Sequence, residues 1–410
     1  MPTMPQTRLI ELYEDLHRNP ELSFNEHLTA GVVSAVLRDL GFVVEEGQGG
    51  TGVVGILGRG TGPVVWLRAD MDALPVVEAT GVTYTSEVDG VAHACGHDVH
   101  VACLLGAATE LAYRKDWGGT VVLIFQPAEE LVKGAQAMVD SGIISRLPNP
   151  QVVLAQHVAP LPAGVLGYTP GPMWAATDSL TITIFGSGGH GSRPETTIDP
   201  VVIAAATILR LQTIVSREVA TTETAVLTVG AVNAGSKHNI IPETATLLVN
   251  IRTYDPDVRK RVLASVNRIV FAESQAAGAS RAPEVQLVES SPTLVNDLDA
   301  GRQTLPALHS VVGAANVIDP GPLPSSEDVQ VLSAAAGAPL VFWLLGGAAP
   351  EHFSDLSSVK SVMEIVRTLP SNHSPQYCPV EIPTLAIGVD ALVAAALIWL
   401  DPNTEGDHYV

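Results

Sequence analysis

The first 160 residues alternate between short runs of β-forming hydrophobic residues and longer runs with apolar side chains at helical spacing. This alternation is the feature that most constrains the fold. The β-rich runs are residues 53–58, 63–69, 119–126 and 151–157. Residues 99–114 between them carry helical spacing, and residues 7–42 predict two helices separated at Asn19-Pro20. Strands that alternate with helices predict an α/β layer architecture with a mainly parallel sheet.

The middle of the chain has a different order of elements. From Ser179 a strand, a helix, two strands, a second helix and a final strand follow one another. This β-α-β-β-α-β order is that of a small ferredoxin-like α+β domain. A chain of 410 residues is also longer than one hydrophobic core usually serves. We therefore expect one α/β domain formed by residues 1–178 and 292–410, with residues 179–291 inserted as a second domain.

Composition argues against several classes of partner. The formal charge is −21, from 22 basic and 43 acidic residues, so the surface repels phosphate backbones and nucleic acid is not an expected partner. The longest apolar run, residues 385–400, is interrupted by Gly388 and Asp390, which predicts a buried helix and no membrane span. Three cysteines form no disulfide framework, and no signal-peptide pattern is visible, so we expect a cytoplasmic protein.

Acidic and imidazole side chains follow the predicted strands. Asp70 and Asp72 come at the end of one strand, and Glu129 and Glu130 come directly after another. His157 ends a third. Because ligands of open α/β sheets gather beyond the carboxyl ends of the strands, these side chains are candidates for one site.

The segment "HACGHDVH", residues 93–100, adds a thiol and three imidazoles, and His373 lies in a loop near the C-terminus. Thiolate, imidazole and carboxylate together suit zinc. The supply exceeds four ligands, which indicates two metals about 3.5–4 Å apart, as in aminopeptidases and related hydrolases. Other interpretations stay open: Cys95 and His97 as a nucleophile with its base, Glu129-Glu130 as a solvated pair, or single histidines with structural roles.

The order of seven motifs resembles the metal-dependent amidohydrolases of the aminoacylase and carboxypeptidase group. The subgroup it is most similar to contains hippurate hydrolases, auxin-conjugate hydrolases and bacterial N-acyl-amino-acid amidohydrolases. The motifs run from near the N-terminus to about Pro375 and are LHRNPELSFNE, RADMDALP, HACGHDVH, FQPAEELVKGAQAMVDSG, AQHVAPLPAG, GGHGSRPETTIDP and NHSP.

The resemblance implies a catalytic domain with a dinuclear metal centre and an inserted lid or dimerisation domain. The metals would be two divalent ions per chain, with zinc expected and manganese, cobalt or nickel as alternatives. Cys95 would bridge the two ions. The implied metal ligands are Cys95, His97, Glu130, His157 and His373.

The same resemblance implies roles for residues that do not bind metal. Glu129 would be the general base and then the proton donor, and Asp72 would orient the ligands. His190 would reach into the active site of a partner subunit and polarise the scissile carbonyl. Asn239 and Arg252 would contact the carboxylate end of the substrate.

The implied function is hydrolysis of the amide bond of N-acyl amino acids, with N-acyl-glutamine or aromatic acyl conjugates as candidate substrates. The implied assembly is a homodimer or higher homo-oligomer formed through the inserted domain. A dipeptidase or carboxypeptidase with the same metal centre is the alternative. A non-catalytic binding protein and a cysteine hydrolase are further hypotheses. The chain departs from the family at Glu195, where relatives often have histidine, and in the longer segment 351–372.

Overall fold

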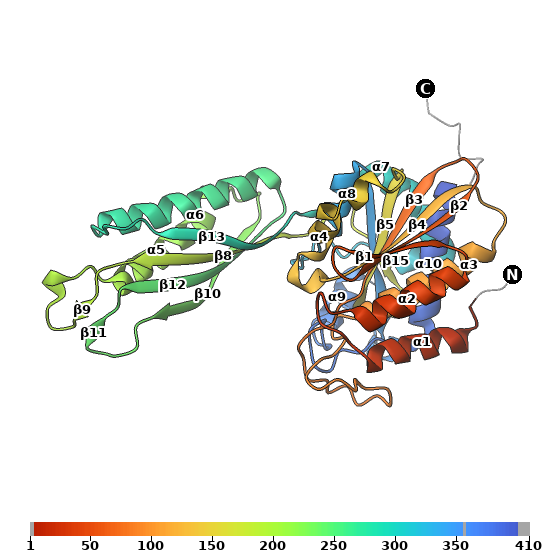
Figure 1. Ribbon diagram of the computed structural model, residues 1–410, viewed down its shortest axis with the longest axis horizontal. Helices are drawn as coiled ribbons and strands as arrows, with labels where there is room; N and C mark the ends of the chain where they lie inside the picture. Colours follow the sequence, from red (N-terminus) through yellow and green to blue (C-terminus); the bar gives the residue numbers. More distant parts are fainter. Residues whose placement is uncertain (1–3, 356–357, 401–410) are drawn as a thin grey trace, which may run out of the picture. The chain divides into compact units, whose positions relative to one another are not determined.

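The computed structural model describes residues 4–355 and 358–400, and the chain divides into two compact units (Figure 1). The first unit contains the described residues up to Met173, Val295–Pro322 and the described residues from Asp328 onward. The second unit is Trp174–Leu294 together with Leu323–Glu327. The sequence predicts that the inserted domain is residues 179–291. The second unit also includes Leu323–Glu327, a short later segment that no sequence pattern indicates.

The first unit is built on an eight-stranded sheet with the order β1-β2-β4-β3-β5-β16-β6-β15. Its strands are β1 (Val43–Gln48), β2 (Gly52–Arg59), β3 (Val64–Asp70), β4 (Gly119–Gln126), β5 (Val152–Pro162), β6 (Leu166–Gly167), β15 (Val317–Ile318) and β16 (Leu340–Ala348). The central strands β4, β3, β5 and β16 are parallel. β2 pairs antiparallel with both β1 and β4, and β6 pairs antiparallel with β16 but parallel with β15. The α/β class with a mainly parallel sheet is confirmed, and antiparallel pairs occur toward both edges.

Helices cover both faces of this sheet, as the continuous hydrophobic runs of its central strands require. The helices are α1 (Gln6–Arg18), α2 (His27–Asp39), α3 (His97–Tyr113), α4 (Gly134–Asp140), α7 (Leu298–Val312), α8 (Val329–Ala336), α9 (Val359–Val366) and α10 (Glu381–Leu400). Val65 and Leu67 of β3 belong to the core that contains α1, α2, α3 and α10. Trp66 lies between them in the sequence and donates from its indole to the Pro148 carbonyl at 3.0 Å. Figure 1 shows α1 and α2 on one side of the sheet and α4 and α8 on the other.

Two described helices are long and apolar enough to cross a membrane by length and composition, Pro200–Glu218 and α10. In α10, Leu385, Leu392 and Leu400 are buried in the core cluster. A buried helix is what the interruption at Gly388 and Asp390 predicts for this segment.

The second unit has its own four-stranded antiparallel sheet in the order β10-β12-β8-β13. Its elements are β8 (Ala176–Phe185), β9 (Gly189–His190), α5 (Pro200–Thr213), β10 (Ala225–Ala234), β11 (Ile240–Ile241), β12 (Thr244–Thr253), α6 (Pro256–Ala276) and β13 (Glu284–Ser291). Asp199 and Asp255 accept backbone N–H bonds at the starts of α5 and α6, each followed by a proline at the first helical position. The chain order of the long elements is the predicted ferredoxin-like order. Two further short strands, β7 (Gly171–Trp174) and β14 (Leu294–Asn296), pair with each other.

Candidate metal centre

The carboxyl ends of β3 and β4 supply four of the candidate carboxylates. Asp70 is the last residue of β3 and pairs in register with Gln126, the last residue of β4. Asp72 follows two residues after Asp70, and Glu129 and Glu130 begin a short 3₁₀ turn after β4. Because the two strands are parallel neighbours, all four carboxylates lie at one edge of the sheet.

His157 reaches the same edge from within a strand. The sequence predicts that His157 ends its strand, and this is wrong, because β5 continues to Pro162. Ala155 pairs in register with Arg68 of β3, so His157, two residues on, is level with Asp70. β5 therefore extends beyond the point where β3 ends, and the buried imidazole of His157 lies level with that point.

The "HACGHDVH" segment is a tight turn that leads into α3. Gly96 precedes the helix with φ +86°, a conformation that side chains other than glycine adopt with strain. A Cβ on Gly96 would also lie 2.4 Å from Val158 Cγ1. The glycine lets the turn pack against β5, with Cys95 directly before it and His97 opening the helix.

His373 is delivered by a loop between α9 and α10. Its backbone has φ +71°, and its N–H donates to the Ala94 carbonyl at 2.7 Å. The side-chain amide of Asn372 donates to the Cys95 carbonyl at 3.0 Å and to the Val158 carbonyl at 3.2 Å. These bonds attach the loop to the turn that holds Cys95. They hold His373 in a left-handed backbone conformation, which costs a non-glycine residue about 1–2 kcal/mol.

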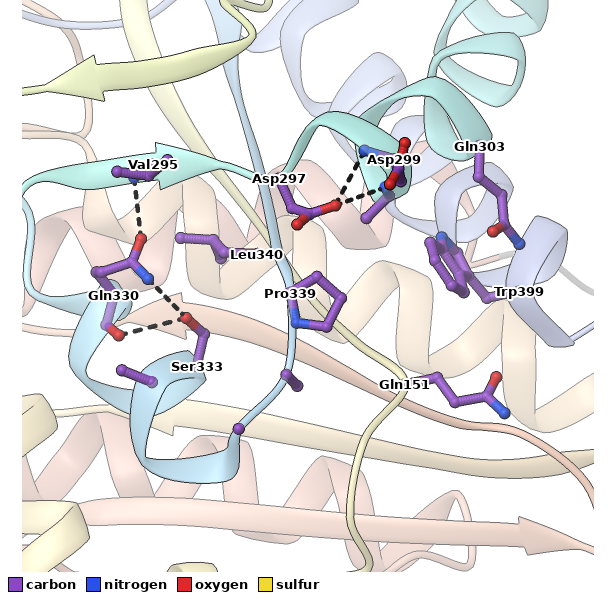
Figure 2. Close-up of a pocket in the computed structure, with 14 residues that line it drawn as sticks. Gln151, Val295, Asp297, Asp299, Gln303, Gln330, Ser333, Pro339, Leu340 and Trp399 are labelled. Atoms are coloured by element: carbon purple, nitrogen blue, oxygen red, sulfur yellow. Dashed lines mark hydrogen bonds between the residues drawn. The ribbon is translucent and has the colours of Figure 1, made fainter.

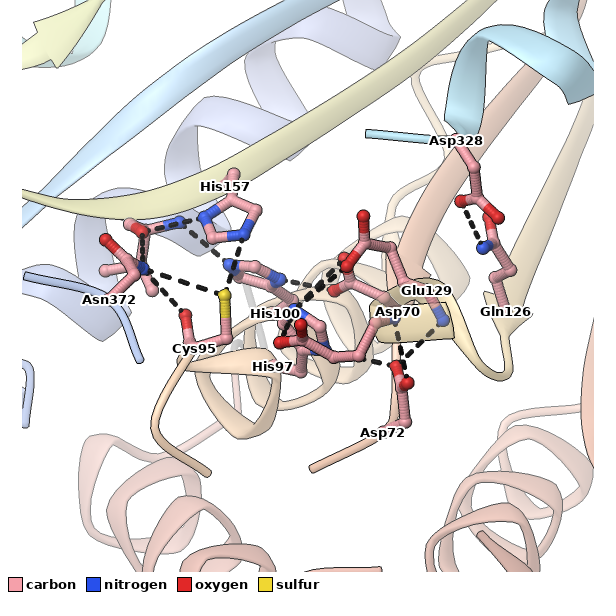
Figure 3. Close-up of polar contacts among 12 residues, drawn as sticks. Asp70, Asp72, Cys95, His97, His100, Gln126, Glu129, His157, Asp328 and Asn372 are labelled. Atoms are coloured by element: carbon pink, nitrogen blue, oxygen red, sulfur yellow. Dashed lines mark hydrogen bonds and ion pairs between the residues drawn. The ribbon is translucent and has the colours of Figure 1, made fainter. Parts of the chain in front are cut away.

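The structure brings all five sequence-predicted ligands together. Cys95 Sγ lies 3.5 Å from His157 Nε2, and His373 Nε2 lies 3.3 Å from Glu130 Oε2. His97 Nε2 is 3.9 Å from a carboxylate oxygen of Glu130 and 3.9 Å from one of Glu129. Figure 3 shows the Cys95, His97 and His157 side chains converging, with the Glu129 carboxylate turned toward them.

The ligand atoms fall into overlapping groups that could each hold an ion. One group is Cys95, Glu130 and His373, and another is His97, Glu129 and Glu130; within each, the ligand atoms lie within 4.8 Å of one another. Cys95 Sγ belongs to the first group and also contacts His157. The sulfur therefore lies between the imidazole of β5 and the imidazole of the α9–α10 loop.

Two buried polar atoms indicate that the cluster fits a cation. Within residues 4–355 and 358–400, His97 Nε2 and Glu130 Oε1 have no hydrogen-bond partner. His97 Nδ1 lies 3.3 Å from Asp72 Oδ1, which places the proton on Nδ1 and leaves the Nε2 lone pair facing the cluster. His157 Nδ1 donates to the Val158 carbonyl at 2.8 Å, so its Nε2 faces Cys95 as an acceptor. Buried polar atoms without partners are costly, and a bound cation would satisfy them.

The surroundings of His97 and His373 favour the positively charged form of each imidazole. Burial favours the neutral form of His97, but Asp70, Cys95 and Asp72 outweigh it and hold the pKa of His97 well above its ordinary value. Hydrogen bonds to Cys95 and Glu130 raise the pKa of His373 to about 10. Sulfur, imidazole and carboxylate donors in a negative pocket are the donor set that a borderline-soft divalent ion such as zinc prefers.

His100 belongs to the cluster but is placed to support it. Its Nδ1 is hydrogen-bonded to Asp70, and its Nε2 accepts from the Val158 N–H at 2.8 Å. Both ring nitrogens are therefore used, and His100 is not a ligand. Arg68, fully buried, donates to Asp70 at 2.8 Å. Sequence reasoning missed this Arg68–Asp70–His100 chain, because a charged residue in a predicted strand carries no signal of its burial.

A second buried network supports the first turn of α3. Asp98 accepts the Val99 N–H at 2.9 Å, and its other oxygen lies 2.6 Å from His17 Nδ1. His17 Nε2 lies 3.3 Å from Glu78. The N-terminal helix α1 is thereby tied to the residue that follows His97.

The remaining cysteines lie outside the ligand cluster. Cys103 is buried inside α3, where Gly388 of α10 packs against it. Cys378 is partly buried and lies 3.7 Å from the Tyr13 hydroxyl and 3.8 Å from the Tyr84 hydroxyl. Neither cysteine belongs to the groups of candidate ligands among the described residues.

In the second unit, His190 and Asn239 lie together. β9 pairs with β11, and the Gly191 N–H donates to the Asn239 carbonyl at 2.8 Å. The Ser192 N–H donates to His190 Nδ1 at 3.1 Å, which makes Nδ1 an acceptor and places the imidazole proton on Nε2. His190 is exposed, so this Nε2–H is available as a donor.

Arg252 lies elsewhere in the same unit. It is near the end of β12, where it pairs with Thr177, and its Nε donates to Asn250 at 3.0 Å. Asn239 precedes the start of β12, so about eight strand residues, roughly 25 Å, separate the two candidate substrate contacts. The structure does not bring Asn239 and Arg252 together within one copy of this unit.

Glu195 and the segment 351–372 are the two departures from the family pattern. Glu195 is exposed in a short 3₁₀ turn, Pro194–Thr196. The segment 351–372 contains α9, and residues 356–357 of it lie outside the described residues.

A cavity of about 590 Å³ in the first unit lies away from this cluster (Figure 2). It opens beside Gln151 and Leu340, at the amino ends of β5 and β16. Gln330 in its wall accepts the Val295 N–H at 2.9 Å and donates to Ser333 at 3.1 Å. The cavity therefore lies at the amino ends of the strands, whereas α/β sheets bind ligands at the carboxyl ends. It is separate from the candidate metal centre.

Comparison with known proteins identifies the family. The model of peptidase family M20/M25/M40 matches residues 66–371. A thermostable carboxypeptidase 2 from Saccharolobus solfataricus is 38% identical over 345 residues, 82% of this chain and 85% of the relative. A hippurate hydrolase from Campylobacter jejuni is 41% identical over 268 residues, 65% of this chain and 70% of the relative. Among solved structures, the Bacillus subtilis YXEP protein, described as a dinuclear metal binding peptidase from the M20 family, has a TM-score of 0.77 at 29% identity, covering 97% of this chain and 98% of its own. The chain therefore belongs to peptidase family M20/M25/M40, and it is a hydrolytic enzyme.

Proposed function

We propose that this enzyme hydrolyses the amide bond of N-acyl amino acids to a carboxylic acid and a free amino acid, using two divalent metal ions. The observation that carries the proposal is the position of Cys95 Sγ. It lies 3.5 Å from His157 and within the group that contains Glu130 and His373, so one sulfur is shared between two sets of ligands. A ligand within reach of two ions would suit a dinuclear centre, whose metals lie about 3.5–4 Å apart.

The residues that would hold the ions are those whose lone pairs face the cluster. Cys95, as the shared ligand, would join His97 and His157 around one ion and Glu130 and His373 around the other. The soft thiolate favours zinc, with manganese, cobalt and nickel as alternatives. Asp72 would orient His97 through the Nδ1 proton.

Glu129 would carry the proton in the reaction. When bound, the metals supply Lewis acidity that brings the pKa of a water toward about 7 and polarises the substrate carbonyl. Glu129, with one oxygen 3.9 Å from His97 Nε2 at the edge of the ligand cluster, would accept a proton from the attacking water. It would then deliver that proton to the leaving amine nitrogen, which departs as the free amino acid.

His190 would donate its Nε2–H to the carbonyl oxygen as negative charge develops there. His190 and Asn239 lie at one end of the second unit and Arg252 lies toward the other, roughly 25 Å away. One N-acyl amino acid is too short to touch both ends of a single copy. We therefore assign Arg252 and the His190–Asn239 pair of one active site to different subunits of a homodimer.

An apolar stripe on α5 supports assembly through the second unit. Val202 is 64% exposed and Leu209 is 74% exposed, two turns apart on the same helix. Exposed aliphatic residues at helical spacing stabilise a protein only when another surface covers them. We propose that the covering surface is a second copy of this unit, in a homodimer or higher homo-oligomer.

The substrate class is drawn from the relatives and from the candidate contacts. The Campylobacter relative is named a hippurate hydrolase, which favours an N-acyl or aromatic acyl conjugate of an amino acid. The Saccharolobus relative is named a carboxypeptidase, which favours the alternative of a dipeptidase or carboxypeptidase with the same centre. Arg252 would bind the carboxylate that both classes share. A cytoplasmic location and a small-molecule substrate complete the proposal.

A hydrolysis screen tests the proposal directly. Purified protein stripped of metal would be supplied with zinc, manganese, cobalt or nickel and incubated with N-acyl amino acids, including N-acyl-glutamine and aromatic acyl conjugates, and with unmodified dipeptides. We expect about two ions per chain and release of free amino acid from the acylated substrates. Preferred cleavage of dipeptides would favour the alternative, and full activity without metal would overturn the proposal.

A further inference from the structure

The segment between α1 and α2 has no part in the proposed chemistry, yet its side chains reach the turn that carries Glu129. Residues 21–26 read "ELSFNE". Glu21 accepts the Leu28 and Thr29 N–H groups at the start of α2, both at 2.9 Å. Ser23 and Glu26 instead point away from α2 toward the carboxyl ends of β3 and β4.

Glu26 is fully buried and binds the backbone directly before Glu129. Its Oε1 accepts the Ala128 N–H at 2.9 Å and the Phe24 N–H at 2.9 Å. Its Oε2 accepts from the Thr51 hydroxyl. A buried carboxylate that bonds to its own segment and to two distant ones is held in one place. Glu26 therefore provides a fixed acceptor for the chain after β4.

The backbone at this point adopts a conformation that side chains other than glycine rarely take. Ala128 has φ +48°, and the turn that it opens places Glu129 and Glu130 side by side. The N–H groups of residues 128, 129 and 130 are all bound by carboxylates: the first by Glu26, and the next two by Asp72 at 3.1 and 3.0 Å. Asp72 in turn accepts from Ser23 at 2.6 Å. Three consecutive backbone amides are thus held by acceptors from distant parts of the chain.

We propose that Glu26 is a positioning residue for Glu129: by accepting the Ala128 N–H it holds the left-handed turn that aims the Glu129 carboxylate at the cluster. The proposal rests on the role of Glu129 in the proposed function. Asp72 also contacts the candidate ligand His97, whereas the Glu26 carboxylate accepts hydrogen bonds from Ala128, Phe24 and Thr51. Substituting Glu26 therefore changes the turn without removing a direct contact to a candidate metal ligand, and the Glu130 N–H keeps its acceptor, Asp72.

Three variants and one control test this role. Glu26→Ala removes the acceptor, and Glu26→Asp retracts it from Ala128 while keeping the charge. Glu26→Gln keeps one oxygen for the Ala128 and Phe24 N–H groups, and its amide can donate to the Thr51 hydroxyl. The matched control is Glu21→Ala, which removes a carboxylate of the same segment that also accepts two backbone amides, away from Glu129.

The measurements are kcat and KM per folded, metal-loaded enzyme, metal content, and hydrogen–deuterium exchange of a peptide spanning residues 127–133 in the metal-free protein. We expect Glu26→Ala and Glu26→Asp to lower kcat by about 10- to 100-fold, because small misplacements of a catalytic group cost that much. KM and metal content should stay at the wild-type level, and the peptide should exchange faster. Glu26→Gln should stay within about threefold of wild type, and Glu21→Ala should leave kcat unchanged.

Several results would overturn the proposal. They are an unchanged kcat in Glu26→Asp, a loss in Glu26→Gln as large as in Glu26→Ala, or a loss of metal that accounts for the loss of activity. If Glu26→Ala does not fold, the Asp and Gln variants carry the test. Failure of the proposed function shows separately, as turnover retained by Glu129→Gln. In that case, the hydrogen–deuterium exchange of residues 127–133 in the metal-free protein still reports whether Glu26 holds the turn.

Discussion

Replacing Asp72 with asparagine should weaken metal binding although Asp72 is not itself a candidate ligand. Its Oδ1 contacts His97 Nδ1 at 3.3 Å and the Glu129 N–H at 3.1 Å, and its Oδ2 accepts from Ser23 at 2.6 Å and from the Glu130 N–H at 3.0 Å. Four donors thus converge on two oxygens in a fully buried position. Asparagine supplies one oxygen and one NH₂ group. Two of the four donors must therefore face the NH₂ group, which cannot accept their hydrogen bonds.

The size of the effect follows from which pair loses its acceptor. The Ser23 hydroxyl can rotate to accept a hydrogen bond, so the asparagine nitrogen should take the Oδ2 position and leave the Glu130 N–H without an acceptor. An unsatisfied buried donor costs about 1–3 kcal/mol, and the bonds that remain lose their charge assistance. Changes to residues that orient metal ligands cost about 10- to 100-fold in affinity. We expect this range for Asp72→Asn, which corresponds to about 1.4–2.8 kcal/mol.

The assay is a zinc titration against a competing chelator, with circular dichroism to confirm folding. Asp297→Asn is the control, since Asp297 also accepts two backbone amides in the same unit but lies at the start of α7. Asparagine caps helices as well as aspartate, so this variant should bind zinc like wild type. Wild-type affinity in folded Asp72→Asn would refute the reasoning that Asp72 orients the ligand cluster.

Three further predictions concern the subunits, the metals and the thiol. His190→Ala should abolish most activity, and mixing it with Glu129→Gln should restore part of it if His190 acts across a dimer; no recovery after verified subunit exchange would place His190 in its own active site. Chelation should lower the melting temperature of the first unit, because ligand at about 100 times its Kd stabilises a fold by about 2.7 kcal/mol; an unchanged calorimetric transition would contradict a metal bound in this unit. Iodoacetamide should modify Cys95 after chelation and spare it in the metal-loaded protein. If the metal-free enzyme still turns over substrate, and alkylation of Cys95 abolishes that turnover, a cysteine hydrolase is favoured.

The fold could be predicted largely from local patterns. Alternating strand and helix runs predicted the α/β class, and Asn19-Pro20 separated α1 from α2 as expected. These local patterns could not predict how distant strands pair. β2 and β4 are antiparallel although both are simple hydrophobic runs, because strand direction depends on connections and register that no single run encodes.

The candidate site was predictable where chemistry marks a residue and hidden where only packing does. Cys95, His97 and His157 stand out because thiols and imidazoles near strand ends are uncommon without a role. Glu26 and Arg68 carried no such mark, since surface glutamates and arginines are the ordinary case. Glu26 is buried against Ala128, and Arg68 is buried against Gln126 and Asp328. These partners are far away in the sequence, so only the folded chain reveals the burial.

The central claim is that Glu129 moves the proton in a site whose metals are held by other residues. Glu129→Gln in the metal-loaded enzyme tests it most directly, with metal content and turnover measured on the same sample. The account predicts about two divalent ions per chain and turnover reduced by about 100-fold or more, the scale of a lost general base. Two ions with wild-type turnover would show that another group moves the proton.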